Sequence, residues 1–410
     1  TKDFIHDFSP LFVHTRHQTK ESRKGRIEKD DHVLLRLRSA CYSQVCVSRW
    51  CRHLADVEQP AYSKKEIVEA GKTLSQKISE VNVKTLSAFQ VAHNWRASYA
   101  LPMNRVRHEL RGKVLRNEGS GVTAARLKRM SSIRKKLAPG NRTLYQLQDI
   151  AGTRAILPDM ASLDRVSKYF EDGDTLHSIV RLNDYIADPK PDGYRSKHIV
   201  LKFSGEGAEA VYSRQFVEIQ LRTEKQHAWA TAVEAVSLVR NEPMKSGEGS
   251  KDWLRFFNLM SAEIADRELQ VTAKNAIRIE ELKELDSTLG ALKELQGYNQ
   301  ALKFTERVDA RSGQFFLINF DLKSKAMSVS PYSMSKEGNA AYDAEERNVR
   351  GTNAVLVEVD RVHDLRATYP NYFLDVRKFV EECEVSLFGK KVFRFHEMDV
   401  SWVRNWKKPT

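Results

Sequence analysis

The stretch "FVEIQLRT", residues 216–223, constrains the fold most, because apolar and polar residues alternate along it without interruption. Side chains of a β-strand point alternately to opposite faces. One face would carry Val217, Ile219 and Leu221 into a core, and the other would carry Glu218, Gln220 and Arg222. The outer face of an antiparallel sheet gives the same alternation. These eight residues alone therefore predict a strand and leave open whether its polar face is solvated or functional.

The surrounding chain alternates strand and helix patterns, which predicts an α+β fold with a mixed β-sheet flanked by helices. The expected helices cover residues 75–118 with a break near Pro102, a basic stretch over 122–137, residues 161–170 and residues 224–240. The expected strands are "DIAGTRAIL", residues 176–183, "IVLKFSG" and "VEIQLRT".

A length of 410 residues predicts more than one domain. We expect a basic N-terminal segment (1–74), the α+β domain (75–245), a helical segment (250–305) and a small C-terminal α+β accessory domain (306–410). Leu282, Leu285, Leu289 and Leu292 recur at three-four spacing in the helical segment. Two heptads are short for a coiled coil, so this spacing predicts packing in a core.

Composition excludes several classes of protein. No apolar run is long enough to span a membrane, and the first thirty residues are too charged for a secretory signal, so a cytoplasmic protein with no membrane partner is expected. Cys41, Cys46 and Cys51 lie near two histidines. Their five-residue intervals do not match zinc knuckles, so reduced thiols are expected there.

The net charge of +13 is concentrated, since residues 101–140 contain eleven Lys or Arg and two acids. Such a field attracts polyanions. In "RLKRMSSIRKKL", helical spacing would place Lys128, Ser132, Lys135 and Lys136 on one face, with Arg126 and Arg129 nearby. A phosphate cradle and a solvated basic face both remain open for this stretch.

Two further stretches carry candidate chemistry. Asp149 begins an apolar strand and, with Glu218, would suit a magnesium ion that also binds ATP phosphates. Asp149 and Arg154 would face opposite sides of a regular strand unless Gly152 forms a bulge. The loop "DYIADPKPDGYRSKH", residues 184–198, offers Tyr194 as a stacking surface, with Lys190, Arg195, Lys197 and His198 as phosphate or sugar contacts.

These segments, taken in order from about Trp95 to Glu234, resemble the synthetase domain of the RelA/SpoT family. That family moves pyrophosphate from ATP to the 3′-hydroxyl of GDP or GTP and so makes the alarmones ppGpp and pppGpp. The resemblance implies a nucleotidyltransferase-like sheet and a GTP pyrophosphokinase-type transferase. Residues 184–198 would be the acceptor loop. We expect no alarmone hydrolase domain, because His6-Asp7 and His363-Asp364 lack the acids that accompany the family's paired His-Asp metal motif.

The resemblance also implies a role for each matching residue. ATP phosphates would be held by Arg126, Lys128, Ser132 and Lys136, and Mg²⁺ by Asp149 and Glu218. Catalysis would involve Asp149, Glu218 and Arg154, with Glu218 orienting or deprotonating the attacking hydroxyl. The acceptor would be bound by Lys190, Tyr194, His198, Gln220 and Arg222, with roles for His227 and Glu234 less defined.

Several alternatives remain open from the sequence. Asp192 stands where long family members usually have Asn, so the acceptor could be GDP, GTP, an adenine nucleotide or the 3′ end of tRNA. A non-catalytic basic RNA-binding protein on the same fold is a further alternative. The C-terminal domain could be a neutralising or sensing module, and a homo-oligomer or an antitoxin partner is compatible with the sequence.

Overall fold

The computed structural model describes residues 57–389, apart from residues 79, 119, 241, 243, 245–248, 272–274, 302, 306–314, 322–325, 348–352 and 360–361. The predictions made for the first 56 residues, including those for Cys41, Cys46 and Cys51, lie outside the described residues. Residues Asp56–Thr410 form one compact unit. Within the described part of that unit, no helix has the length and apolar character that would let it cross a membrane.

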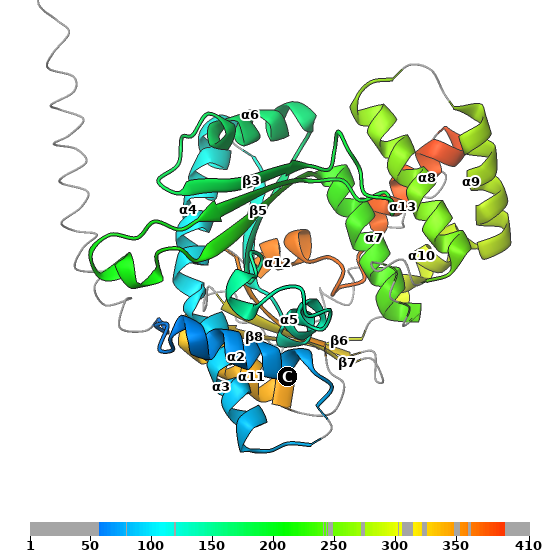
Figure 1. Cartoon of the computed structure of the whole chain (residues 1–410). Coiled ribbons are helices and arrows are strands. Elements are labelled where there is room, and N and C mark those ends of the chain that lie inside the picture. Colours follow the sequence, from blue (N-terminus) through cyan, green and yellow to red (C-terminus); the bar gives the residue numbers. More distant parts are fainter. Residues whose placement is uncertain are drawn as a thin grey trace, which may run out of the picture. The chain divides into compact units, whose positions relative to one another are not determined.

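Helices and strands are interleaved along the chain, as Figure 1 shows. The helices are α2 (Lys64–Ser75), α3 (Val83–Ser98), α4 (Ala100–Glu118), α5 (Met130–Leu137), α6 (Met160–Glu171), α7 (Glu224–Arg240), α8 (Lys251–Glu268), α9 (Ala276–Leu289), α10 (Ala291–Ala301), α11 (Ser335–Arg347), α12 (Val362–Thr368) and α13 (Arg377–Phe388). The strands are β1 (Val122–Leu127), β2 (Ala151–Leu157), β3 (Ser178–Asp184), β4 (Lys197–Lys202), β5 (Phe216–Thr223), β6 (Lys303–Thr305), β7 (Phe315–Asp321), β8 (Ala326–Tyr332) and β9 (Asn353–Glu358).

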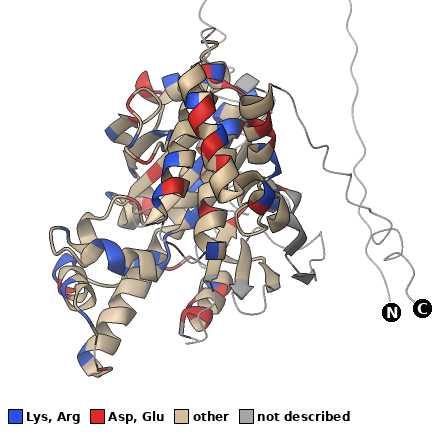
Figure 2. Cartoon of the chain, turned by 90° about the vertical axis from the view of Figure 1, so that its right-hand side faces the viewer, with Lys and Arg blue, Asp and Glu red and all other residues tan. Residues whose placement is uncertain are grey.

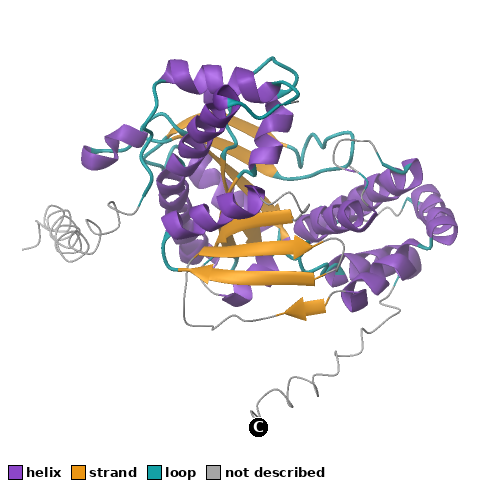
Figure 3. Cartoon of the chain, turned by 90° about the horizontal axis from the view of Figure 1, so that it is seen from below, coloured by secondary structure: helices purple, strands orange, loops and turns teal. Residues whose placement is uncertain are grey.

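The strands form one mixed sheet in the order β3-β4-β5-β2-β1-β9-β7-β8-β6. Strands β2 and β5 are parallel, as are β6 and β8, and the other neighbouring pairs are antiparallel. Figure 3 shows the helices around this sheet. The predicted mixed sheet flanked by helices is therefore confirmed.

The two faces of the sheet differ in polarity at β2 and β5. Thr153, Val217, Ile219 and Leu221 are buried on the face toward α4 and α6, which contact these strands. Residues in the alternate positions face the side on which α7 and α12 lie, because Arg154 on β2 reaches the backbone of α12. The sheet thus places the apolar residues of "FVEIQLRT" in a core and its polar residues on a separate face.

The basic helix predicted over residues 122–137 is wrong in its first half. Residues Val122–Leu127 form β1, which pairs with β2 on one side and with β9 on the other. The apolar spacing that continues from Leu127 to Met130, Ile133 and Leu137 resembles a helical pattern across this boundary. Two neighbouring strands supply hydrogen bonds that the sequence pattern does not reveal, and such tertiary pairing overrides local propensity. Helix α5 begins at Met130, and its apolar positions are buried as expected.

The C-terminal part of the chain is joined to this sheet. Strand β9 pairs with β1 at Ala125↔Glu358 and Arg126↔Val357, so β6–β9 extend the same sheet as β1–β5. The domain boundaries expected at residues 74, 245 and 305 stay predictions.

The helices α7, α8, α9, α10 and α13 share a second core, grouped on the right of Figure 1. Leu282 and Leu292 are buried in it, and Leu285 and Leu289 pack against it. The prediction that these leucines pack in a core is confirmed.

Candidate functional site

The polar face of the sheet brings together side chains from four strands. Opposite one another in register are Arg126, Gly152 and Glu218 in one row, and Arg154, Gln220 and His198 in the next. Arg222 lies two residues beyond Gln220 on β5. Cross-strand partners project to the same face. Six of the predicted site residues therefore share one surface: Arg126, Arg154, His198, Glu218, Gln220 and Arg222.

Glu218 is held by two neighbours on this face. His198 Nδ1 lies 2.9 Å from Glu218 Oε1, and Gln220 Nε2 donates to Glu218 Oε2 at 2.8 Å. Burial raises the pKa of the Glu218 carboxyl, but the hydrogen bond and charge of His198 outweigh burial and the pKa is lowered. Glu218 is therefore a carboxylate at neutral pH. The pKa of His198 is raised by the same contact, against the opposing effect of burial.

Asp149 lies just before β2, beside two lysines of the basic stretch. Lys128 Nζ donates to Asp149 Oδ2 at 2.9 Å, and Lys136 Nζ donates to the same oxygen. Burial raises the pKa of Asp149, but these two cations outweigh it and the pKa is lowered. Since β2 and β5 are adjacent, Asp149 and Glu218 are close enough to interact, and Asp149 raises the pKa of Glu218.

This pair of carboxylates fits the chemistry of a magnesium ion. Both side chains are 17% exposed, and hard oxygen donors are the ligands that Mg²⁺ prefers, usually one or two carboxylates with phosphate oxygens. No group of three or more His, Cys, Asp or Glu among the described residues could hold a metal by itself. Any metal bound by this pair would need further ligands from a bound substrate or water.

Tyr194, on the loop of residues 184–198, belongs to the same hydrogen-bond network. Its hydroxyl lies 2.7 Å from His198 Nε2 and accepts a hydrogen bond from Arg222 Nη2 at 2.5 Å. The Arg222 guanidinium is 4.9 Å from the centre of the Tyr194 ring, and Lys190 Nζ is 4.8 Å from it. Burial raises the pKa of Tyr194, but Arg222 and His198 outweigh burial and lower the pKa to about 7.

Comparison with known proteins places this site in a family. Residues 125–240 match the model described as the region found in RelA / SpoT proteins. Residues 125–240 are a RelA/SpoT region. Every predicted site residue, from Arg126 to Arg222, lies within this range.

Similar proteins include a GTP pyrophosphokinase, YwaC, of Bacillus subtilis, which is 34% identical over 87 residues. That match covers 21% of this chain and 40% of the relative. GTP diphosphokinase CRSH1, chloroplastic, of Oryza sativa subsp. japonica is 30% identical over 158 residues, which cover 35% of this chain and 26% of the relative. The chain thus spans less than half the length of either relative.

Among solved structures, small alarmone synthetase 1 from Bacillus subtilis bound to its product pppGpp is 22% identical, with a TM-score of 0.37. It covers 46% of this chain and 95% of its own length. Small alarmone synthetase 2 from Bacillus subtilis is 24% identical, with a TM-score of 0.36, and covers 49% of this chain and 97% of its own length.

The structure shows whether a bulge at Gly152 brings Asp149 and Arg154 to the same face of the sheet. The register of β2 runs unbroken from Ala151 to Ile156 against β1 and from Ala151 to Leu157 against β5, so Gly152 forms no bulge. Asp149 precedes the strand, and strand alternation does not govern its direction. Two of the cations proposed from the loop also lie elsewhere: Lys197 Nζ pairs with Asp164 of α6 at 3.0 Å, and Arg195 Nη1 donates to Ile186 O at 2.8 Å.

The remaining predicted residues flank this site. Ser132 is half-buried in the first turn of α5, between Lys128 and Lys136 along the chain. His227, on α7, has a pKa well below its usual range because of burial and the nearby charges of Arg154 and Arg222. Glu234, on the same helix, interacts electrostatically with Arg126 and Arg154.

A segment outside the RelA/SpoT region lies against Arg126, which was predicted to bind ATP, and Arg154, which was predicted to be catalytic. Arg154 Nη1 donates to Thr368 O at 3.1 Å, and its guanidinium is 5.8 Å from the centre of the Tyr369 ring. Burial lowers the pKa of Arg126, but interactions with Tyr372 and Glu234 outweigh burial, so the pKa is raised. His227 Nε2 lies 3.2 Å from Ala367 O. Residues 367–372 therefore cover the part of the site formed by Arg126 and Arg154.

Sequence reasoning missed several of these neighbours. Tyr185 packs edge-on against His198, with ring centres 5.1 Å apart, and an aromatic residue at the start of the loop 184–198 was the available signal. The cover by residues 367–372 had no such signal, because it depends on how a distant segment packs.

Proposed function

We propose that the chain is an ATP-dependent pyrophosphotransferase that moves pyrophosphate from ATP to the 3′-hydroxyl of GDP or GTP. The observation that carries the proposal is the placement of Asp149 and Glu218 at neighbouring parallel strands, with Lys128 and Lys136 bound to Asp149. The RelA/SpoT match and the names of the relatives support it. Transfer between phosphates depends on positioned charge more than on covalent chemistry, and this site is built of positioned charges.

Glu218 is the residue suited to the acceptor hydroxyl. Its lowered pKa keeps it ionised at neutral pH, and each carboxylate oxygen has lone pairs beyond those used by His198 and Gln220. It would orient the hydroxyl and receive its proton. His198 and Gln220 would hold the carboxylate in place, since each binds one of its oxygens.

Mg²⁺ would be held by Asp149 and Glu218. When bound, it would neutralise charge on the phosphates during transfer. Lys128 and Lys136 already lie against Asp149, and they would bind donor phosphates together with Ser132.

The acceptor would be bound by the opposite end of the same face. Tyr194 offers a ring between the cations Lys190 and Arg222. His198, Gln220 and Arg222 continue from that ring toward Glu218, so a base near Tyr194 and a hydroxyl near Glu218 are compatible with one bound nucleotide.

Binding of ATP at Arg126 and Arg154 requires residues 367–372 to move, because Thr368 and Tyr369 occupy the contacts of Arg154. Lys128 and Lys136 are not covered by these residues in the contacts described. Residues 367–372 would thus obstruct the part of ATP that Arg126 and Arg154 bind, and would not obstruct the phosphates that Lys128 and Lys136 bind.

The test offers the purified chain Mg²⁺ and ATP labelled in its β and γ phosphates, with GDP, GTP, AMP, ADP or tRNA supplied separately. Transfer of label to GDP or GTP is expected. Label that reaches only tRNA or only an adenine nucleotide would replace the acceptor proposed here, and no transfer to any acceptor would contradict the enzymatic function.

A further inference from the structure

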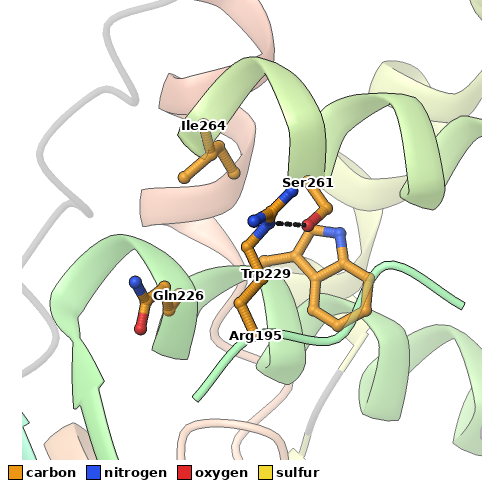
Figure 4. Close-up of a pocket in the computed structure, with 5 residues that line it drawn as sticks. All are labelled: Arg195, Gln226, Trp229, Ser261 and Ile264. Atoms are coloured by element: carbon orange, nitrogen blue, oxygen red, sulfur yellow. Dashed lines mark hydrogen bonds between the residues drawn. The ribbon is translucent and has the colours of Figure 1, made fainter. Parts of the chain in front are cut away.

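Helix α8 lies against the turn of the acceptor loop that precedes Tyr194. Asn258 Nδ2 donates to Pro191 O at 2.9 Å, and Ser261 Oγ donates to Gly193 O at 2.5 Å. Arg195 Nε donates to Ser261 Oγ at 3.2 Å, the bond drawn in Figure 4. Residues three apart on a helix share a face, so Asn258 and Ser261 form one contact surface for the loop.

The approach of loop and helix is close enough to require a glycine. Gly193 has φ +87°, and a Cβ at this position would lie 3.1 Å from Asn258 Cα and 3.1 Å from Ser261 Cβ. The same Cβ would lie 3.4 Å from the Trp229 ring. Both the backbone conformation and the space exclude a larger residue without strain. The turn is therefore seated directly on α8 and α7.

The turn is stiff, so its position fixes that of Tyr194. Gly193 N donates to Lys190 O at 2.8 Å, and Tyr194 N donates to Asp192 Oδ1 at 3.0 Å. Arg195 binds the other limb of the loop through Ile186 O. A displacement of Gly193 would carry the Tyr194 ring with it.

Helix α8 is itself a rigid support. Trp253, Phe256, Phe257 and Met260 are each buried in the core shared with α7 and α13. Trp229 Nε1 on α7 donates to Phe257 O at 2.7 Å. The small pocket between loop and helices is lined by side chains of all three elements: Arg195, Gln226, Trp229, Ser261 and Ile264 (Figure 4).

We propose that α8, which lies outside the RelA/SpoT region, positions the acceptor loop, with Asn258 and Ser261 as positioning residues for the acceptor nucleotide. This inference rests on the proposed function for its kinetic consequence. The bonds to Pro191 O and Gly193 O hold Tyr194 where it meets His198 and Arg222. Their loss loosens the acceptor side of the site and leaves Lys128, Lys136 and Asp149 unchanged.

The kinetic test compares Asn258→Ala, Ser261→Ala and the double variant with the parent chain. The Michaelis constant for the acceptor is expected to rise about fivefold in each single variant and at least about tenfold in the double variant, as for the loss of one or two hydrogen bonds. The Michaelis constant for ATP is expected to stay within about twofold, which a general loss of structure would not produce. Gly193→Ala, which forces the turn away from α8, should raise the acceptor constant at least as much as the double variant.

Arg255→Ala is the matched control on the same helix. Arg255 binds Glu281 of α9 through two hydrogen bonds, at 2.6 and 2.8 Å, and none of its described contacts reaches the loop. The acceptor constant of this variant should equal that of the parent. An unchanged acceptor constant in the double variant would overturn the proposal, as would an equal rise in the constants for acceptor and ATP.

Amide hydrogen exchange of residues 186–198 separates this inference from the proposed function, since it needs no activity. Exchange in this segment should be faster in the Asn258→Ala and Ser261→Ala variants than in the parent and the Arg255→Ala control. Unchanged exchange would overturn the positioning role even if the chain transfers pyrophosphate. The two tests can also give opposite answers. If exchange is faster in these variants but the parent chain transfers label to no acceptor, α8 positions the loop and the proposed pyrophosphotransferase function is rejected.

Discussion

Glu218 is the residue on which the proposed chemistry depends most, because it is the carboxylate that lies on the same face as both the cations and the acceptor loop. Replacement by glutamine keeps the size of the side chain and removes its charge. We expect Glu218→Gln to lower the rate of transfer by about 10²-fold to 10⁴-fold, the range for loss of a general base. The measurement is the initial rate with saturating ATP and acceptor.

The control for this prediction is Glu284→Gln, which removes an exposed carboxylate from α9. Its rate should match that of the parent. The thermal unfolding midpoints of both variants should also stay close to the parent value. A Glu218→Gln variant that retained more than about a tenth of the parent rate would contradict the assignment of this carboxylate as base.

Tyr194 gives a prediction in pH. Burial disfavours the phenolate, but Arg222 and His198 outweigh it and lower the pKa of Tyr194 from its ordinary value near 10 to about 7. Between about pH 7 and pH 10, the folded chain has released a proton that the unfolded chain retains. The contribution of this group to stability therefore rises with pH across that window and is lost as pH falls through the folded pKa.

Ultraviolet absorbance at about 295 nm, where tyrosinate absorbs, measures the ionisation of Tyr194 directly. We expect a step near pH 7 in the folded chain and its disappearance in Tyr194→Phe. Replacement of a half-buried tyrosine elsewhere in the chain, such as Tyr62, by phenylalanine should leave the step in place. Absence of any tyrosinate below about pH 9 would show that Arg222 and His198 do not stabilise the phenolate as the geometry indicates.

At the scale of elements, α9 is held in the molecule by few buried residues. Leu282 is fully buried in the core shared by α7, α8, α10 and α13. Leu282→Ala should lower the free energy of unfolding by about 2–5 kcal/mol, because the lost side chain leaves a cavity. Ile277 lies on the same helix and is 83% exposed, so Ile277→Ala should change it by less than about 0.5 kcal/mol. Urea unfolding of both variants measures the difference, and equal effects would contradict the placement of Leu282.

Elements with strong local patterns were predictable from the sequence. The period of two in "FVEIQLRT" identified β5 and its polar face, and the helix expected over residues 224–240 coincides with α7. Strand β1 was missed because its identity comes from hydrogen bonds to β2 and β9, which are distant in the chain. The contact of Gly193 with α8 was missed for the same reason, since a glycine in a turn-rich loop does not indicate which helix it approaches.

The composition of the site was more predictable than its surroundings. The residues of β2, β4 and β5 were brought to one face by register, which follows from the period of the strands. The cover of Arg154 by Thr368 and Tyr369 depends on tertiary packing between segments more than two hundred residues apart, as the 214-residue separation of Arg154 and Thr368 illustrates. No local pattern encodes such a contact.

At the scale of the whole molecule, part of the basic surplus is paired with acids within the described residues. Figure 2 shows Lys and Arg interspersed with Asp and Glu over the described helices of that view. Part of the cationic stretch 101–140 is instead used internally. Arg107 is fully buried against Glu358, and Lys128 and Lys136 pair with Asp149. Net charge alone would therefore overstate the surface available to a polyanion such as tRNA.

The buried pair of Arg107 on α4 and Glu358 on β9 joins the C-terminal strands to a helix that precedes the RelA/SpoT region. Arg107 Nη2 donates to Glu358 Oε1 at 2.8 Å, and both side chains are fully buried. Arg107→Met would remove a fully buried cation from beside a fully buried carboxylate, and we expect a loss of about 3–5 kcal/mol in the free energy of unfolding. Arg105 pairs with Glu209 at a partly exposed position on the same helix, so Arg105→Met should cost less than about 1 kcal/mol.

A double-variant cycle measures how far this one contact couples the two parts of the chain. Glu358→Gln introduced into Arg107→Met also removes the buried carboxylate charge that Arg107 faces in the parent, so the double variant should be more stable than the sum of the two single losses predicts. Urea unfolding monitored by tryptophan fluorescence gives the four free energies. Additive losses, or an Arg107→Met variant within about 1 kcal/mol of the parent, would mean that the pair does not fasten β9 to α4. The expected coupling would instead mean that the Arg107–Glu358 pair helps to position the C-terminal strands. Residues 367–372, which follow these strands and cover Arg154, would then depend on a charge pair on the opposite face of the sheet.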